Sequence, residues 1–141
     1  MRTRVGAVVV LLSMAGGSAG AAESYKVIVN ARMSGKGIGR ETLAQIYLGR
    51  VERWSDGHPI VAVDLSTTSP VRESFSQGVL GMSVLGVRQQ WTRSISTGHL
   101  PPVTKSTDED IIAFVASRNG AVGYVSADAL LPDTVRAVAV Q

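Results

Sequence analysis

The chain has 141 residues, enough for one domain of ordinary size and too few for two independently folded lobes. Hydrophobic residues make up 45% and charged residues 18%, with five prolines, which favours a chain with a buried core over a disordered, collagen-like or coiled-coil one. The sequence has no cysteine, so disulfides, iron–sulfur clusters, thiol nucleophiles and cysteine-ligated zinc sites are excluded. Function must therefore depend on oxygen, nitrogen and backbone groups.

The first 22 residues have the pattern of a secretory signal peptide. Arg2 and Arg4 precede an apolar run over residues 5–14, and residues 19–21 (AGA) provide a cleavage signal. The run is about ten residues long, whereas a membrane-spanning helix needs about twenty. We therefore expect a domain over residues 23–141, exported to the periplasm without stable membrane insertion. Loss of the two arginines reduces the 14 basic residues to 12, against 11 acidic ones, and this net charge of +1 makes nucleic acid a poor partner.

The first half of the mature sequence predicts two strands and two helices. In chain order these are a strand at residues 25–30, a helix at 40–48 ended by Gly49, a strand at 59–65, and a helix that begins at Pro70 and ends near Gly78 or Gly81. Apolar residues four apart, Val71, Phe75 and Val79, indicate the second helix. Ser69 suits its N-cap, and the fixed φ of Pro70 suits its first position.

The second half predicts two further helices and then two strands. In chain order these are a helix capped by Ser83 and ended by Gly98, a helix capped by Thr107 and ended by Asn119-Gly120, and strands at 121–125 and 135–140. The apolar stripe of the first of these helices consists of Val84, Val87, Trp91 and Ile95. Helices between strands require crossover connections, so we expect an α/β fold with a mixed, mostly parallel sheet of about four or five strands flanked by helices.

A polar loop at the carboxyl end of the second predicted strand is the candidate binding site. Ser66, Thr67, Thr68 and Ser69 offer four consecutive hydroxyl groups, and Arg72 follows in the first turn of the helix. Free N–H groups and the dipole at a helix start stabilise an oxyanion, and a guanidinium adds a planar fork of donors. The same residues are also compatible with an ordinary cap and turn, so this pattern alone does not decide the function.

Other chemistry has weaker support in the sequence. His58 and His99 lie in separate predicted loops without a carboxylate at metal-ligand spacing, and the acidic residues 108–110 suit a helix start. Neither a G-x-S-x-G nor an S-x-x-K arrangement surrounds the loop serines. We therefore expect no catalysis, no metal and no cofactor.

Several segments resemble phosphate ABC transporter substrate-binding proteins. Residues 41–50 (ETLAQIYLGR) followed by residues 53–57 (RWSDG) are similar to the family's L-x-x-I-F-x-G stretch and its later W-x-D-G. Residues 66–75 are similar to its binding loop and helix, with Ser69 at the serine of an S-G-T motif, and residues 120–124 (GAVGY) to its P-G-A-I-G-Y strand entry. Together with a segment over residues 91–98, the resemblance covers about residues 25–140.

The resemblance implies one lobe of a type II periplasmic binding protein with a role in phosphate uptake or sensing. Its implied partners are inorganic phosphate or a similar oxyanion, an ABC permease or envelope sensor, and a second copy or another protein that closes over the anion. Arg72 is a physical substitute for the family's arginine and not a carried-over residue. The alternative is a periplasmic interaction module derived from the same lobe that binds no ligand, which Pro70 and Val71 favour because they replace the glycine and threonine of S-G-T.

Overall fold

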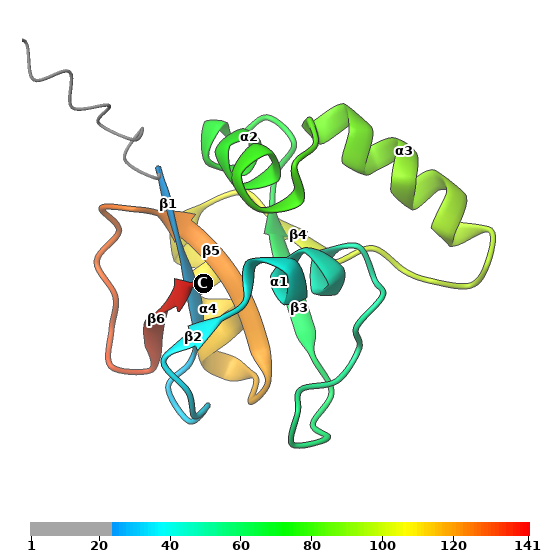
Figure 1. Cartoon of the computed structure of the whole chain (residues 1–141). Helices are drawn as coiled ribbons and strands as arrows, with labels where there is room; N and C mark the ends of the chain where they lie inside the picture. Colours follow the sequence, from blue (N-terminus) through cyan, green and yellow to red (C-terminus); the bar gives the residue numbers. More distant parts are fainter. Residues whose placement is uncertain (1–23) are drawn as a thin grey trace, which may run out of the picture.

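A six-stranded mixed sheet organises the chain in the computed structural model, which describes residues 24–141 (Figure 1). The strands are β1 (Tyr25–Asn30), β2 (Gly37–Ile38), β3 (Val61–Leu65), β4 (Val103–Lys105), β5 (Ala121–Ser126) and β6 (Val135–Val140), in the spatial order β2-β6-β1-β5-β3-β4. The pairs β2–β6, β5–β3 and β3–β4 are parallel, and β1 is antiparallel to both of its neighbours. The predicted α/β class and mostly parallel sheet are confirmed.

Four α-helices and one π-helical segment flank the sheet. They are α1 (Arg40–Tyr47), α2 (Pro70–Phe75) continued by the π-helical turn η1 (Ser76–Leu80), α3 (Val84–Ile95) and α4 (Asp108–Ser117). α4 lies on one face of the sheet, and α1 and α2 lie on the other (Figure 1). Consecutive residues of β5 show this, because a Cβ on Gly123 would meet Ile111 and Val115 of α4, whereas Tyr124 contacts Phe75 of α2.

Most of the predicted helix boundaries agree with the structure, but α4 ends at Ser117 with the extended Arg118 at its C-cap, before the predicted end at Asn119-Gly120. The Ser83 hydroxyl accepts a hydrogen bond from Gly86 N at 3.1 Å, and the Thr107 hydroxyl accepts one from Asp110 N at 3.1 Å. Gly49, with φ +74°, follows the C-cap of α1, and Gly81, with φ +64°, is the C-cap of η1. The stop near Gly81 is confirmed, and the chain between Phe75 and Gly81 is π-helical.

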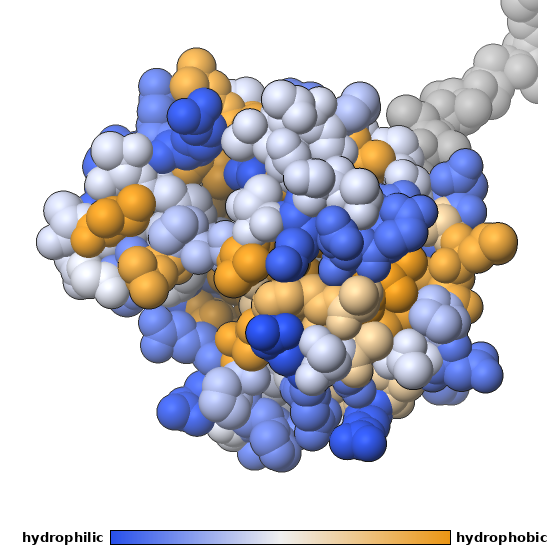
Figure 2. All heavy atoms as spheres, turned by 180° about the vertical axis from the view of Figure 1, so that it is seen from behind, coloured by the Kyte–Doolittle hydropathy of each residue, from blue (hydrophilic) through white to orange (hydrophobic). Residues whose placement is uncertain are grey.

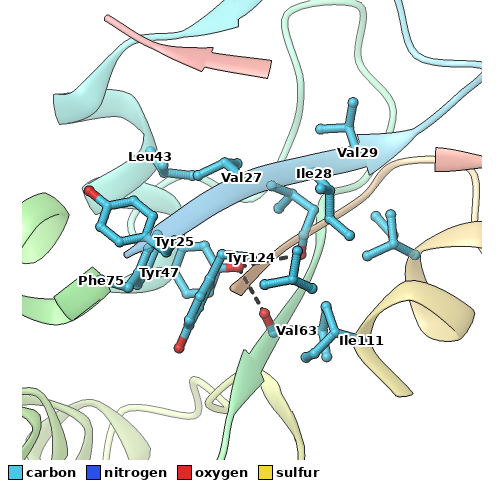
Figure 3. Close-up of a cluster of buried hydrophobic side chains, with 14 of the residues drawn as sticks. Tyr25, Val27, Ile28, Val29, Leu43, Tyr47, Val63, Phe75, Ile111 and Tyr124 are labelled. Carbon is cyan, nitrogen blue, oxygen red and sulfur yellow. Dashed lines mark hydrogen bonds between the residues drawn. The ribbon is translucent and has the colours of Figure 1, made fainter. Parts of the chain in front are cut away.

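Four aromatic rings form the centre of the core on the face covered by α1 and α2 (Figure 3). Phe75 stacks on Tyr124 with ring centroids 3.8 Å apart, and the edge of Tyr47 packs on Phe75 at 4.8 Å. Tyr25 completes the cluster at 5.4 Å from Phe75. The Tyr47 hydroxyl donates a 2.8 Å hydrogen bond to Val63 O, so its polar end is satisfied inside the core. The cluster fixes α2 against the sheet.

The helix α3 extends away from the sheet (Figure 1) and is attached through its buried side chains Val84, Val87 and Trp91. The buried Trp91 ring packs on Gly49, where a Cβ would lie 2.6 Å from its Cη2 atom, and its Nε1 donates to Tyr47 O at 3.2 Å. The prediction that Ile95 continues the buried stripe was wrong, since its side chain is 52% exposed. The last turn of the helix extends beyond the rest of the domain, so Ile95 has no surface to pack against.

The opposite face of the molecule is only partly covered by α4. Seen from behind, apolar side chains form a band from the middle of this face to its right side, with polar side chains above and below it (Figure 2). α4 covers β5 and β1, whereas Ala137 and Ala139 of β6 remain exposed. No helix within residues 24–141 is long and apolar enough to cross a membrane. The predicted leader, residues 1–22, lies outside the described residues.

Two short strands were absent from the sequence prediction. β2 has two residues inside the loop that precedes α1, and β4 has three residues after the Pro101-Pro102 pair. Both strands lie at the edges of the sheet. Segments this short carry no measurable alternation of apolar and polar residues, so only their partners β6 and β3 define them as strands.

Candidate functional site

The loop Ser66–Ser69 lies at the carboxyl end of β3 and leads into α2. Ser66 N donates to Lys105 O at 2.9 Å, which anchors the start of the loop to the end of β4. Ser69 N donates to Ser66 O at 2.9 Å, which folds the four residues into a tight turn. All four predicted hydroxyl residues are therefore brought together at one corner, and Thr67 and Thr68 are exposed there.

The donors of this corner are only partly used by the protein. Ser69 occupies the N-cap position of α2 with φ −75° and ψ 127°, as predicted, but its hydroxyl makes no capping hydrogen bond. The Ser66 and Thr68 hydroxyls share one hydrogen bond of 3.1 Å. A helix start leaves its first N–H groups without intrahelical acceptors, and the missing cap leaves those of α2 without a side-chain acceptor as well. The corner therefore presents amides and hydroxyls to the outside.

Arg72 lies below this loop and does not reach into solvent. Its side chain is buried, with Nη1 donating to Leu65 O at 2.9 Å and Nη2 lying 3.3 Å from Oδ2 of Asp64. The buried Nε atom has no acceptor among residues 24–141. The sequence predicted a fork of donors offered at the surface, whereas the structure places that fork on Asp64 and on the residue before the loop. Arg72 is therefore paired with Asp64 and fixes the base of the corner rather than offering a free charge to a ligand.

Asp64 is the buried partner that sequence reasoning did not assign to the site. Its Oδ2 atom faces Arg72, and its Oδ1 atom accepts a hydrogen bond from the Tyr124 hydroxyl. The Tyr124 hydroxyl in turn accepts a 3.2 Å hydrogen bond from Leu65 N. A signal existed in the sequence, because an aspartate inside an otherwise apolar strand needs a partner. The three side chains join β3, α2 and β5 below the loop.

Burial has the largest effect on the pKa values of the side chains beneath the loop. It raises the pKa of Asp64 above 3.8, while the nearby Arg72 guanidinium and the Tyr124 hydroxyl oppose the rise. Burial and the neighbouring Asp64 carboxylate raise the pKa of Tyr124, so its hydroxyl keeps its proton and donates. Burial likewise raises the pKa of Tyr47.

The raised pKa of Asp64 predicts that the stability of the folded protein depends on pH. The folded protein binds the proton of the Asp64 carboxyl group more tightly than the unfolded chain does. Asp64 therefore favours folding below pH 3.8, the ordinary pKa of an aspartate, and this contribution is lost as the pH rises through the pKa of the folded state. In urea unfolding at a series of pH values, wild type should lose stability relative to Asp64→Asn as pH rises above 4. A relative gain for wild type over the same pH range would contradict the raised pKa.

The other sequence candidates lie apart from the loop. His58 Nδ1 lies 2.9 Å from Asp56 Oδ2, and His99 Nδ1 lies 3.5 Å from Glu52 Oε1, in two separate exposed pairs. The Asp108 carboxylate accepts a hydrogen bond from Ser126 N at the start of α4. Across residues 24–141, no three His, Asp or Glu side chains are grouped closely enough to hold a metal ion.

Comparison with solved structures identifies the architecture. A phosphate ABC transporter substrate-binding protein from Clostridium perfringens, solved with bound phosphate, superposes with a TM-score of 0.65 at 21% identity, over 82% of this chain and 44% of that one. The chain has the fold of phosphate-binding proteins. An ABC-type phosphate transport receptor from Vibrio cholerae gives 0.64 at 19% identity, covering 82% and 45% of the two chains. PstS from Borrelia burgdorferi gives 0.63 at 13%, covering 84% and 47%.

The phosphate-binding-protein fold confirms the resemblance predicted from sequence. The chain spans less than half the length of each of these solved proteins. Neither a protein-family model nor a curated protein sequence matches it. The likeness therefore establishes the fold, and the function must be argued from the site.

Proposed function

We propose that the chain is a periplasmic oxyanion-binding lobe, phosphate being the preferred ligand, that works in phosphate uptake or sensing. The observation that carries the proposal is the uncapped start of α2 behind the hydroxyl loop Ser66–Ser69, which the Arg72–Asp64 pair holds from beneath. The Clostridium perfringens protein with the same fold was solved with bound phosphate, which supports the choice of anion.

The chemistry of the corner suits a tetrahedral oxyanion. The Ser66, Thr67, Thr68 and Ser69 hydroxyls can each donate to an anion oxygen, and the first-turn amides of α2 add further donors. The helix dipole contributes up to about 2 kcal/mol in a partly buried geometry. Pro70 has no N–H to contribute. Arg72 acts by pairing with Asp64 and holding Leu65 O beneath the loop, rather than through direct hydrogen bonds to the anion.

The exposure of the loop limits the affinity of this lobe by itself. About three or four hydrogen bonds to a charged ligand, at about 1.5–3 kcal/mol each, must offset several kcal/mol of lost ligand freedom and the desolvation of the anion. The expected Kd therefore lies in the millimolar to micromolar range. Tighter binding requires a second surface over Thr67 and Thr68, supplied by a second copy or by another protein, with an ABC permease or an envelope sensor receiving the signal or the ligand.

Amide NMR titration of the mature protein with inorganic phosphate and with sulfate tests this function. Shifts should concentrate on residues 66–73, and Ser69→Ala combined with Thr68→Val should weaken phosphate binding about tenfold or more, because two hydroxyl donors are lost. Ser96→Ala, an exposed serine beyond α3, is the matched control and should leave the titration unchanged. Shifts scattered evenly over the surface would instead indicate nonspecific ion binding.

A second function fits one feature of the same corner. Pro70 and Val71 stand where the resembled family has a glycine and a threonine, and this removes one amide and one hydroxyl from the site. A lobe that kept the fold and lost its ligand would serve as a periplasmic interaction module. Absence of any shift at about 10 mM phosphate, well above a micromolar to millimolar Kd, would favour that module over the binding lobe.

A further inference from the structure

A small cleft lies at the end of the sheet opposite residues 66–69, which form the proposed oxyanion corner. It has a volume of about 170 Å³ and is lined by Arg32, Met33 and Ser34, by Trp54, Ser55, Asp56 and His58, and by Asn119 and Gly120. These segments follow β1, precede β3 and precede β5, and the strand directions bring all three to the same edge (Figure 1). The loop Ser66–Ser69 lies at the other end of β3.

The walls of this cleft are held in place by the protein itself. Trp54 Nε1 donates to Gly120 O at 2.9 Å, and Trp54 N donates to His58 O at 2.9 Å. Gly120 has φ +103°, and a Cβ there would lie 2.6 Å from Pro59 O, so the backbone packs tightly behind the indole. On the far wall, Arg32 N donates to the buried Asn30 side chain at 3.0 Å. The backbone of the cleft and its indole wall are therefore pre-formed.

Several polar side chains in the cleft have unused hydrogen-bonding capacity. Within residues 24–141, the side chains of Arg32, Ser34, Ser55 and Asn119 are exposed to solvent and make no hydrogen bond or ion pair with other residues, so a ligand can replace the water on them. They offer a guanidinium fork, two hydroxyls and one carboxamide, which together can both donate and accept. Four unpaired polar groups beside one tryptophan are the composition of a recognition site with an apolar wall and a few orienting polar groups.

The charges of the cleft select among ligand classes. Arg32 is positive, and Asp56 is negative and fixed, with Oδ1 accepting from His58 N at 3.0 Å and Oδ2 lying 2.9 Å from His58 Nδ1. These hydrogen bonds and the neighbouring His58 lower the pKa of Asp56, so its carboxylate stays ionised. An anion would be repelled by Asp56 and a cation by Arg32. A neutral ligand rich in hydroxyl groups meets neither penalty.

We propose that this cleft binds a neutral monosaccharide unit. The C–H face of a pyranose ring is apolar and can cover the indole of Trp54, while its hydroxyls donate and accept around the rim and so match Arg32, Asn119 and the two serines. The volume of about 170 Å³ is of the size of one sugar ring. The cleft is separate from the oxyanion corner, so sugar and phosphate bind independently.

Two-dimensional NMR of the indole N–H groups gives a direct test. The probes are D-glucose, D-galactose and N-acetyl-D-glucosamine at about 100 mM, far above a millimolar Kd. At least one sugar should shift the Trp54 indole signal and leave that of the buried Trp91 unchanged. Arg32→Ala and Asn119→Ala should each weaken this binding about fivefold or more, because each removes hydrogen bonds to the ligand. Arg88→Ala, an exposed arginine on α3, is the matched control.

Three results would overturn the proposal. The first is the absence of a Trp54 shift with every sugar, while the spectrum shows a folded protein. The second is a Trp54 shift with sodium acetate or phosphate but not with the sugars, which would make the cleft an anion site. The third is sugar binding that Arg32→Ala and Asn119→Ala leave as strong as Arg88→Ala does. Phosphate binding at residues 66–73 is measured separately, so its failure does not affect this test.

Discussion

Arg72→Met should lower the free energy of unfolding by about 3–5 kcal/mol, because it leaves the Asp64 carboxylate buried without its cation. Arg72 and Asp64 are only 6% and 8% exposed, so water cannot replace the lost partner. The carbonyl of Leu65 also loses its 2.9 Å hydrogen bond from Nη1. Urea unfolding followed by circular dichroism at neutral pH measures the change.

Two further variants show whether the buried charge is the cause. Arg88→Met removes an exposed arginine from α3 and should change stability by no more than about 0.5 kcal/mol. The double variant Asp64→Leu with Arg72→Met removes both charges and should recover much of the loss, because a buried pair often contributes little net stability over apolar residues. If Arg72→Met changed the free energy of unfolding as little as Arg88→Met, the Arg72–Asp64 pair would not stabilise the structure beneath the loop.

Phe75→Ala should cost about 3–5 kcal/mol of unfolding free energy, because it opens a cavity among three tyrosine rings. Phe75 is 1% exposed and stacks on Tyr124 with centroids 3.8 Å apart (Figure 3). Since Phe75 also ends α2, its removal should loosen that helix on the sheet. Chemical unfolding measures the stability, and hydrogen exchange of the amides over residues 70–80 measures the loosening.

Size and position provide the controls for this core prediction. Phe75→Leu keeps most of the volume and should cost less than Phe75→Ala. Leu130→Ala, at a side chain that is 92% exposed, should leave the stability within about 0.5 kcal/mol of wild type. Equal losses for Phe75→Ala and Leu130→Ala would show that the aromatic cluster does not hold the domain together.

Strong local patterns predicted most of the secondary structure. Apolar alternation identified the strand at residues 25–30, and capping residues such as Ser83 and Thr107 marked the helix starts correctly. The short strands β2 and β4 could not be found, because their strand character depends on their pairing with β6 and β3. The exposure of Ile95 could not be predicted either. The spacing of apolar residues shows which face of a helix is apolar, but not how far along the helix the rest of the domain covers that face.

The candidate site was predicted in its position and only partly in its chemistry. The hydroxyl loop lies between β3 and α2, where the sequence placed it. The burial of Arg72 was missed, because an arginine in a first helical turn is usually solvated. Asp64 in the apolar strand, eight residues before Arg72, was the available sign of a buried pair. The orphaned Nε of Arg72 depends on packing that no local pattern encodes.

The cleft beside Trp54, proposed to bind a sugar, depends entirely on tertiary structure. The sequence shows a turn near Trp54 and a helix end at Asn119-Gly120, separated by more than sixty residues. Only the parallel pairing of β3 with β5, Val61 opposite Ala121, brings the two segments to one edge. A third segment, at Arg32, arrives because β1 runs antiparallel to β5. No spacing rule connects three such loops.

The position of β1 inside the sheet has a consequence for the order of folding. This strand pairs with β5 and β6, with Val27 opposite Tyr124 on one side and Val138 on the other. Its partners are synthesised about a hundred residues later, so closing these pairs carries a large loop entropy. The middle of the sheet therefore stays open while the chain emerges, and the domain should complete its sheet only when its last strands are available.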